Sequence, residues 1–308
     1  MKKIGITGAG GYVGAMLCQK LKEDYELVLI DDLSNSQITE INDIKIKKQD
    51  VYDFDGLKEL LDVDLVVHLA ALSGVLECDE NPTLAYKTNV IGTLNICEVC
   101  RERKIPLIFS SSVGVIGDPK QLPIKEDHPL NPLNLYGFTK KIAQENIISY
   151  SKDFPAYILI KTNIYGSYSV DGKKISKNSV INIFLDNAKE RKPLMINKPG
   201  TQARDFIYIS DVIEAYLLAI KKIEKEKNGT KLFCIGSGKS TSIVDVAEMI
   251  KGVALEKAFE VQVQMRENPR KRETLIEEFY VDISKAKEYL NFKPQHRLER
   301  DLREMFAD

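Results

Sequence analysis

The stretch KIGITGAGGYVG, residues 3–14, decides the fold. Residues 3–7 are mostly apolar and β-branched, as in a buried strand, and residues 12–22 have the apolar spacing of a helix. Between them, glycines let the backbone turn tightly and approach a diphosphate, whose charge the free amides and dipole of the helix stabilise. The spacing is G-x-x-G-x-x-G, a variant of the dinucleotide-binding fingerprint. The predicted cofactor contacts here are Gly8, Gly10, Gly11, Tyr12, Val13 and Gly14.

Strand-like and helical segments alternate on both sides of this turn. The predicted strands cover residues 26–30, 65–69, 107–110 and 157–160. The predicted helices cover residues 54–61, 82–103 and 136–151. This alternation predicts an α/β protein with a doubly wound parallel (Rossmann) sheet.

The character of the chain changes after residue 165. A polar loop at residues 167–177 precedes a helix at 180–191, and a strand near 231–235 is expected to return to the sheet. Residues 1–165 are therefore predicted to form a cofactor-binding domain, to which 204–237 return. Residues 166–203 and 238–308 are predicted to form a smaller C-terminal α/β substrate-binding lobe.

Composition narrows the classes of partner. Lys and Arg total 44 against 45 Asp and Glu, so the net charge of -1 favours neither nucleic acid nor an anionic membrane. The absence of a long apolar run argues against a membrane span. Five scattered cysteines suit reduced thiols in a cytoplasmic protein, and Cys97 and Cys100 have no second pair that would complete a metal site. A small-molecule substrate and no metal are expected.

Two acids follow the second predicted strand. Asp31 and Asp32 lie about 20 residues beyond the glycines, where a carboxylate can accept hydrogen bonds from the ribose hydroxyls of a dinucleotide. A carboxylate there repels a 2′-phosphate, and no arginine lies nearby in sequence to reverse the preference. NAD is therefore the expected cofactor rather than NADP.

A candidate acid/base group lies at the start of the helix predicted at 136–151. Tyr136 and Lys140 are four residues apart, so a helix places both on one face. A phenol with a pKa of about 10 is a poor base unless a nearby positive charge stabilises the phenolate. Ser112 ends the serine run that follows the strand near Leu107, at the sheet edge where ligands collect. We expect Ser112, Tyr136 and Lys140 to be catalytic.

With these residues in view, the sequence resembles the extended short-chain dehydrogenase/reductases, in their nucleotide-sugar epimerase/dehydratase branch, and in pattern the UDP-galactose 4-epimerases. The resemblance spans nearly the whole chain. It is carried by TGAGGYVG (7–14), DDLSNS (31–36), QDV (49–51), HLAA (68–71), TNVIGT (88–93), FSSSVGVIG (109–117), YGFTK (136–140), TNIYG (162–166), RDFIYISDV (204–212) and DISKAKEYL (282–290).

The resemblance implies roles for further residues. The cofactor set would include Asp31, Asp32, Asn35 and Ser36 at the adenosine ribose, Asp50 and Val51 at the adenine, and Leu69, Ala70, Ala71, Asn89, Ser110, Tyr136 and Lys140 toward the nicotinamide. The substrate set would be Ser73, Ser112, Tyr136, Asn163, Arg204 and Arg272, with the arginine forks suited to a diphosphate. It also implies a homodimer packed through helices 82–103 and 136–151.

The residues after Ser112 limit which reaction of the family is expected. Dehydratases and decarboxylases of the family carry acids there, whereas this chain has Val113 and Gly114. The expected reaction is 4-epimerisation of a nucleotide-sugar, with a UDP-sugar as the leading substrate. Tyr136 would take the proton of the 4-hydroxyl as hydride leaves C4, which gives a 4-keto intermediate. That intermediate would rotate, and hydride would return to its opposite face. Gly114 could leave room for that rotation. Two alternatives stay open, a dehydrogenase or reductase of another sugar nucleotide or small alcohol, and a non-catalytic NAD sensor.

Three positions depart from the family pattern. Ile160 stands where an arginine is usual, Ile116 where a tyrosine is frequent, and Leu275 where an aspartate is expected. These positions touch or neighbour the substrate pocket that the resemblance implies. The sugar and the nucleotide base therefore stay open at the level of sequence.

Overall fold

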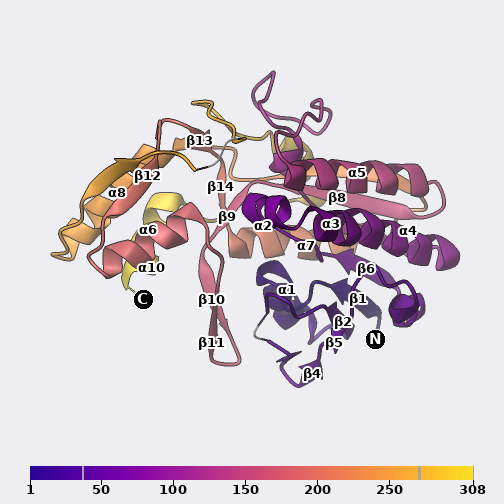
Figure 1. Ribbon diagram of the computed structural model, residues 1–308. Coiled ribbons are helices and arrows are strands. Elements are labelled where there is room, and N and C mark those ends of the chain that lie inside the picture. The colour runs from indigo at the N-terminus through magenta and orange to yellow at the C-terminus, as the bar shows by residue number, and fades with distance from the viewer. Residues whose placement is uncertain (37, 270–271, 308) are drawn as a thin grey trace.

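The computed structural model describes residues 1–36, 38–269 and 272–307. Within these residues a seven-stranded parallel sheet has the order β15-β8-β7-β6-β1-β2-β5. This is the 3-2-1-4-5-6 order of a Rossmann fold with one further strand. The predicted fold class is confirmed, and Figure 1 shows the sheet with helices on both faces. The strands are β1 (Lys3–Thr7), β2 (Glu26–Asp31), β5 (Lys47–Lys48), β6 (Leu65–His68), β7 (Leu107–Ser112), β8 (Pro155–Lys161) and β15 (Gly229–Ile235).

Alternate residues of β2, β6, β7, β8 and β15 supply two separate cores. In β7, Ile108 packs in one core while Phe109 packs in the other, because successive side chains of a strand point to opposite faces. Helices α1 (Tyr12–Leu21), α7 (Ile209–Ile223) and α9 (Ser284–Leu290) cover the face of Ile108. Helices α4 (Gly92–Arg103) and α5 (Leu135–Tyr150) and the 3₁₀ helix η1 (Asp55–Asp62) cover the other face.

The helix predicted at 82–103 is divided into three segments. It begins as α3 (Pro82–Tyr86), continues as a π-helical segment η2 (Lys87–Ile91) and ends as α4. A short helix α2 (Val75–Glu80) precedes it. π-Helical segments widen a helix locally and are frequent at functional sites. The apolar pattern predicts the helix but not this interruption.

A smaller lobe has its own core. Helices α6 (Val180–Lys189), α8 (Ile243–Glu256) and α10 (Leu298–Ala307) pack with a parallel pair of strands, β12 (Leu194–Asn197) and β17 (Val263–Arg266). The polar segment predicted as a loop at 167–177 is an antiparallel hairpin, β10 (Ser167–Val170) with β11 (Lys173–Ser176). Figure 1 shows the lobe beside the carboxyl ends of the sheet strands.

Short strand pairs join the lobe to the sheet. β9 (Asn163–Tyr165) pairs with β14 (Phe206–Tyr208), and β13 (Ala203–Arg204) pairs with β16 (Thr241–Ser242). The segment of α9 belongs to the sheet side, because Ala286 and Leu290 share a core with β1. The chain therefore crosses between sheet and lobe several times. A further hairpin, β3 (Glu40–Ile41) with β4 (Ile44–Lys45), comes between β2 and β5 in the order of the chain.

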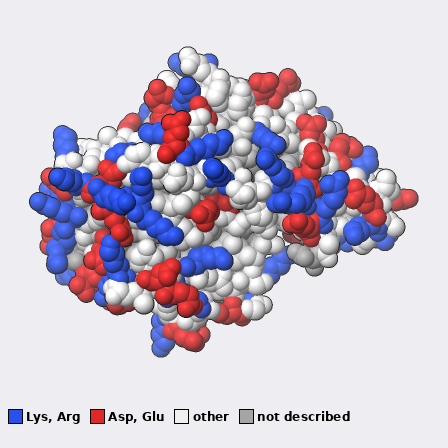
Figure 2. Space-filling view, turned by 180° about the vertical axis from the view of Figure 1, so that it is seen from behind, with Lys and Arg blue, Asp and Glu red and all other residues white. Residues whose placement is uncertain are grey.

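The surface carries charges of both signs. On the face shown in Figure 2, Lys and Arg side chains are interspersed with Asp and Glu. The five cysteines all lie in the described part of the chain and are buried free thiols. Of the helices described, none has both the length and the apolar character that crossing a bilayer requires.

Candidate active site

The glycine turn after β1 has no room for side chains. Gly8 has a φ of +72°, and a Cβ there would lie 2.6 Å from the amide nitrogen of Ala70. A Cβ on Gly14 would lie 2.1 Å from the carbonyl oxygen of Gly8. Contacts below 3 Å are repulsive, so both positions require glycine and bring three backbone segments together at the carboxyl edge of the sheet.

The amino terminus of α1 is open toward this edge. Gly11 is the N-cap, no side-chain cap hydrogen bond is made there by the residues the structure describes, and the first turn holds no acid. The first amides of a helix have no partner within the helix and carry its positive dipole end. This cradle fits the diphosphate of a dinucleotide.

Asp31 stands at the end of β2 beside the turn. Its carboxylate accepts hydrogen bonds from Gly10 N at 2.9 Å and Leu33 N at 2.8 Å. Burial raises the pKa of Asp31, although these two hydrogen bonds oppose that effect. The hydroxyl of Ser36 donates to the Gly10 carbonyl at 2.7 Å. Asp31 and Ser36 therefore hold the turn in shape.

The other residues of the predicted cofactor set follow the same edge. Asp32 accepts hydrogen bonds from Ser34, and the Val51 carbonyl accepts one from Asn95. Leu69, Ala70 and Ala71 are half-buried after β6, where Leu69 N and Ala70 N donate to Thr7. The remaining positions are Tyr12 and Val13 in the first turn of α1, exposed Asn35 and partly exposed Asp50.

Asn89 lies behind this row, inside the π-helical segment. Its Oδ1 accepts from Leu72 N at 2.8 Å, and its Nδ2 donates to the Leu72 carbonyl at 3.1 Å and to Thr139 Oγ1 at 2.9 Å. These bonds tie the loop after β6 to α5. We interpret Asn89 as a positioning residue, because its amide holds backbone and a helix together.

Tyr136 occupies the second position of α5. The side chain of Asn134 caps this helix by accepting a hydrogen bond from Gly137 N at 3.0 Å. This cap fixes where the helix begins and so places Tyr136. Burial raises the pKa of Tyr136 to about 12, while a hydrogen bond with the Ser112 side chain acts in the opposite direction. A Cβ on Gly114 would lie 3.5 Å from Ser112 Oγ and 3.6 Å from the Tyr136 ring. Ser112 and Tyr136 thus meet beside Gly114, where a Cβ would be in ordinary van der Waals contact with both.

Lys140 lies one turn further along α5 and is buried. Its Nζ donates to the Ser110 carbonyl at 2.9 Å and lies 4.6 Å from the centre of the Phe109 ring. Burial lowers the pKa of Lys140 to about 7. The phenol of Tyr136 is thus a weak acid and the amine of Lys140 a weak base, and a positive charge nearby would lower the pKa of both, which favours the phenolate and the neutral amine.

Two of the predicted substrate residues, Asn163 and Arg204, lie on the lobe side of this group. Asn163 begins β9 and donates through its backbone to the Asp205 carbonyl. The guanidinium of Arg204 donates to Glu273 Oε1 at 3.1 Å and to the Thr274 carbonyl at 2.9 Å. Thr274 donates in turn to the Gly117 carbonyl, in the loop that follows Ser112. Ser73 and Arg272 are exposed, and among the described residues no hydrogen bond joins them to this network.

The three residues that depart from the family pattern lie in different surroundings. Ile116 and Ile160 are both buried and share one apolar core, so two polar positions have been replaced together by packing. Leu275 is 48% exposed. The side chains of Ile116 and Ile160 thus lie in the sheet core, and on the lobe side Arg204 pairs with Glu273.

Two residues of the site were not foreseen from sequence. Lys161 ends β8 and is buried beside Ser110, and Glu273 neutralises Arg204. A lysine that closes an otherwise apolar strand, PAYILIK, is the signal that could have revealed Lys161. Glu273 lies in a charged segment with no such pattern, so only the fold places it.

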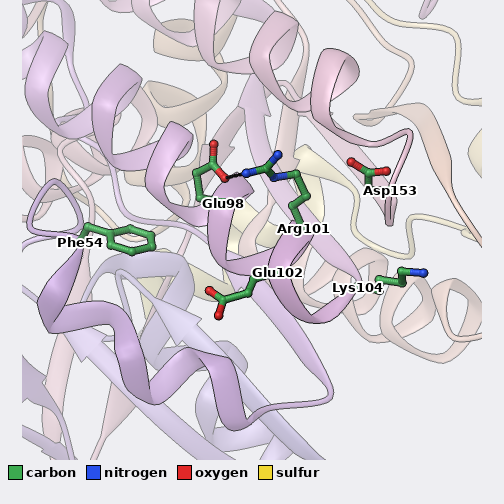
Figure 3. A pocket seen from close by; sticks show the side chains of 6 residues that line it. All are labelled: Phe54, Glu98, Arg101, Glu102, Lys104 and Asp153. Atoms are coloured by element: carbon green, nitrogen blue, oxygen red, sulfur yellow. Dashed lines mark hydrogen bonds and ion pairs between the residues drawn. The ribbon is translucent and has the colours of Figure 1, made fainter.

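The hollow drawn in Figure 3 is a different feature. It has a volume of about 470 Å³ and is lined by Phe54, Glu98, Arg101, Glu102, Lys104 and Asp153. Most of these residues lie at the carboxyl end of α4, just before β7 begins at Leu107. That is the amino edge of the sheet, opposite to the edge where Rossmann folds bind ligands.

Known proteins are similar to this chain in sequence and in fold. The sequence profile described as the NAD dependent epimerase/dehydratase family matches residues 4–236. The chain belongs to this family. A putative UDP-glucose 4-epimerase of Methanocaldococcus jannaschii is 33% identical, over 97% of this chain and 95% of its own.

Solved structures agree with the family assignment. The UDP-glucose 4-epimerase of Thermotoga maritima, in a structure with UDP-glucose, has a TM-score of 0.86 at 25% identity, covering 99% of this chain and 97% of that one. The UDP-glucuronic acid 4-epimerase of Bacillus cereus, with UDP-glucuronic acid and NAD, has a TM-score of 0.84 at 26% identity, covering 99% and 98%. The chain is accordingly an NAD-dependent enzyme of the epimerase family.

Proposed function

We propose that this enzyme is an NAD-dependent 4-epimerase of a UDP-sugar. The observation that carries the proposal is the meeting of Tyr136 with Ser112, above a buried Lys140, at the carboxyl end of β7. The relatives described above as UDP-sugar 4-epimerases support the substrate class. Val113 and Gly114 supply no acid or base beside Ser112, which favours epimerisation over dehydration or decarboxylation.

The residues of the glycine turn, with Asp31, would hold the cofactor, and Lys140 would face its nicotinamide ribose. Bound NAD supplies a reversible acceptor for the hydride of the sugar C4. The carboxylate of Asp31 favours free ribose hydroxyls over a 2′-phosphate, because two anionic groups would repel each other there.

The protein's own part in the reaction is proton transfer and orientation. Ser112 holds the 4-oxygen of the sugar, and Tyr136, in its phenolate form, takes the hydroxyl proton on Oη as the C4 hydride leaves. The 4-keto sugar then has to rotate within the site so that its other face is presented. The hydride returns to that face, and Tyr136 gives the proton back. The lack of a side chain at Gly114 would favour that rotation.

The proposal extends to assembly and location. Apolar side chains are exposed on neighbouring helices that pack together, and α5 contacts α3, η2 and α4. These side chains are Leu84 at 37%, Ile91 at 44%, Phe138 at 44% and Ile148 at 44% exposed. An apolar surface of this kind supports a homodimer through these helices. The buried free thiols support a cytoplasmic location.

Incubation with a panel of UDP-, GDP- and dTDP-sugars tests the function. The expected result is a product of unchanged mass and inverted C4, read by mass spectrometry and NMR, without net change in the absorbance of added NAD. Net reduction of NAD would instead identify a dehydrogenase. No turnover of any sugar, with NAD binding retained, would point to a sensor and refute the proposal.

Replacing the phenol tests the proposed acid/base. Tyr136→Phe keeps the ring and removes the hydroxyl, so kcat should fall about 10²- to 10⁴-fold while NAD still binds. Tyr150→Phe is the matched control, because it lies on the same helix and its hydroxyl bonds only Glu98 among the described residues. Near-normal turnover in Tyr136→Phe would remove Tyr136 from the mechanism.

A further inference from the structure

A glutamate occupies the arginine fork on the lobe side of the site. Glu273 Oε1 lies 3.1 Å from Arg204 Nη2, and Glu273 Oε2 accepts a hydrogen bond from Asn268 Nδ2 at 3.2 Å. The side chains of Arg204 and Glu273 are only 13% and 16% exposed. Both oxygens of the carboxylate are therefore held where most of the surrounding water is excluded. No step of the proposed reaction has so far used this glutamate.

The segment that carries Glu273 links β13 to the loop after Ser112. We call residues 273–276 the strap. Its Thr274 carbonyl accepts a hydrogen bond from Arg204 Nη2 at 2.9 Å. Its Thr274 Oγ1 donates to the Gly117 carbonyl at 3.2 Å, in the loop that follows Ser112. The strap is thus fastened both to the arginine and to the loop of the proposed active site.

The other predicted substrate residue of this region lies at the same junction of sheet and lobe. Phe206, two residues after Arg204, pairs with Asn163 in the register of β14 and β9. The backbone of Asn163 also donates to the Asp205 carbonyl at 3.0 Å. Residues predicted to hold a nucleotide-sugar therefore come from two adjacent strands, and Glu273 already occupies the one positive charge among them.

An arginine in this setting requires an anion. A guanidinium stays charged at every ordinary pH, and a charge removed from water is unfavourable unless an opposite charge meets it. Taking away one partner of a buried ion pair leaves the other uncompensated. Glu273 therefore leaves Arg204 at the lowest cost when another anion takes its place. A diphosphate suits the exchange, because the planar fork of arginine pairs with phosphate oxygens as it does with a carboxylate.

We propose that Glu273 is an internal competitor for Arg204, and that the diphosphate of the substrate displaces it on binding. This inference rests on the proposed function, because a UDP-sugar supplies the diphosphate. In the empty site the carboxylate neutralises the guanidinium. On binding, Arg204 exchanges one anionic partner for another, no covalent bond changes, and the partly exposed Glu273 carboxylate turns to water.

The competition has opposite effects on order and on affinity. Glu273 holds the flexible arginine in place before the substrate arrives, so binding does not have to order that side chain. At the same time, the apparent affinity falls by the fraction of molecules in which the fork is free. A fork that is free in about one molecule in ten weakens binding about tenfold.

Substitution of the carboxylate tests the competition. Glu273→Gln keeps the shape of the side chain and its accepting oxygen but removes the charge. The affinity of the NAD-loaded enzyme for UDP, measured by calorimetry at fixed ionic strength, should rise about 5- to 20-fold. Glu277→Gln is the matched control, because it removes the same charge from an exposed position in the same part of the chain. It should leave the affinity for UDP unchanged.

A double-mutant cycle separates competition from simple charge repulsion. Arg204→Gln should weaken UDP binding, and adding Glu273→Gln to it should then have little further effect, because the group for which the anions compete is gone. A glutamate that merely repels UDP would tighten binding at least as much when removed in the absence of the arginine. That result, or no tightening in Glu273→Gln alone, would overturn the proposal.

A shorter acid gives a second test that does not depend on the arginine variant. Glu273→Asp keeps the charge but is one methylene shorter, so it should lose most of its hold on Arg204. Competition then predicts tighter UDP binding, whereas repulsion predicts no change. Melting curves establish that each variant is folded. Wild-type affinity in a folded Glu273→Asp variant would contradict the competition.

Kinetics distinguish failure of this inference from failure of the proposed function. Glu273→Gln should lower KM for the nucleotide-sugar and leave kcat within about twofold, because the exchange precedes the chemical step. If UDP binding follows the cycle but no sugar turns over, the epimerase function fails and the competition stands. If sugars are epimerised while the Glu273 variants bind UDP like the wild type, the competition is refuted and the function stands. Absence of UDP binding in every variant would also refute the competition.

Discussion

At the scale of single residues, the site depends on two groups whose pKa values are shifted by burial. Lys140 is buried and Tyr136 is half-buried at the same sheet edge, and burial raises the pKa of Tyr136 to about 12 and lowers that of Lys140 to about 7. Burial disfavours the charged form of each, so both are predominantly neutral or readily neutralised in the free protein. Such perturbed groups are typical of acid/base catalysis, where the ligand supplies the remaining charge.

Lys140 should therefore reduce stability while it serves function. Its pKa is about 7 in the folded protein and about 10.4 in an unfolded chain, so between these values the unfolded state binds more protons and stability rises with pH. Lys140→Met should melt at a higher temperature than the wild type near pH 6 to 7, with a gain that shrinks toward pH 10. Differential scanning fluorimetry across this range measures the gain.

The outcome for this variant separates stability from activity. Lys140→Met should lose most of its turnover even though it is the more stable protein at neutral pH. Lys141→Met is the matched control on α5, since Lys141 Nζ bonds the Leu130 carbonyl, and it should show little dependence on pH. A melting temperature for Lys140→Met that is lower than the wild type at every pH would contradict the buried charge.

At the scale of elements, helix α10 is held by a polar chain of contacts. Asp301 accepts from Tyr165 Oη at 2.6 Å and from His296 Nδ1 at 3.0 Å. His296 Nε2 then accepts from Ser210 at the start of α7, at 2.7 Å. Because the carboxylate accepts at Nδ1, the imidazole carries its proton there. The network ties α10 of the lobe to β9 and α7.

Removing the carboxylate should loosen that connection. Asp301→Ala leaves a tyrosine hydroxyl and an imidazole N–H without their acceptor, so the free energy of unfolding should fall by roughly 2–4 kcal/mol. Urea denaturation measures the loss. Glu304→Ala is the control, because Glu304 lies on the same helix and forms only an exposed pair with Arg300 among the described contacts. Equal stability of both variants would refute the structural role of Asp301.

A glycine in α8 offers a change of the opposite sign. Gly252 is exposed within Ile243–Glu256, and a Cβ there would have no atom within 4 Å. Gly252→Ala should stabilise the protein by about 0.5–1 kcal/mol, because alanine loses less backbone entropy in a helix. Thermal unfolding and turnover should show a higher melting temperature with unchanged activity. A lower melting temperature would mean that this segment is not a regular helix.

At the scale of the whole molecule, the exposed apolar face of α3, η2 and α5 should bury itself in a homodimer. Phe138→Glu and Ile91→Glu place charges in that face and should convert a dimer to monomers, measured by sedimentation or light scattering. Leu255→Glu, at a 65% exposed position on α8, is the control and should leave the assembly unchanged. A wild type that is monomeric at micromolar concentration would refute the interface.

Much of the sheet could be predicted from the sequence, because each strand and helix carries its own apolar period. The glycine turn, Asp31 and the spacing of Tyr136 and Lys140 are local features, so their placement near one edge followed from the parallel topology. The π-helical segment at Lys87–Ile91 and the hairpin β10–β11 could not be predicted, since packing against α5 and the neighbouring helices decides them.

The sequence by itself determined the fold class, the family and the preference for NAD, because these depend on residues close together in the chain. Only the tertiary structure decided that Arg204 is paired with Glu273 and that Lys140 shares Ser110 with Lys161. Those partners are 69 and 21 residues apart in the chain, counted from their numbers. Ion pairing and the loss of solvent around an amine depend on distance in space, which no local pattern of residues records.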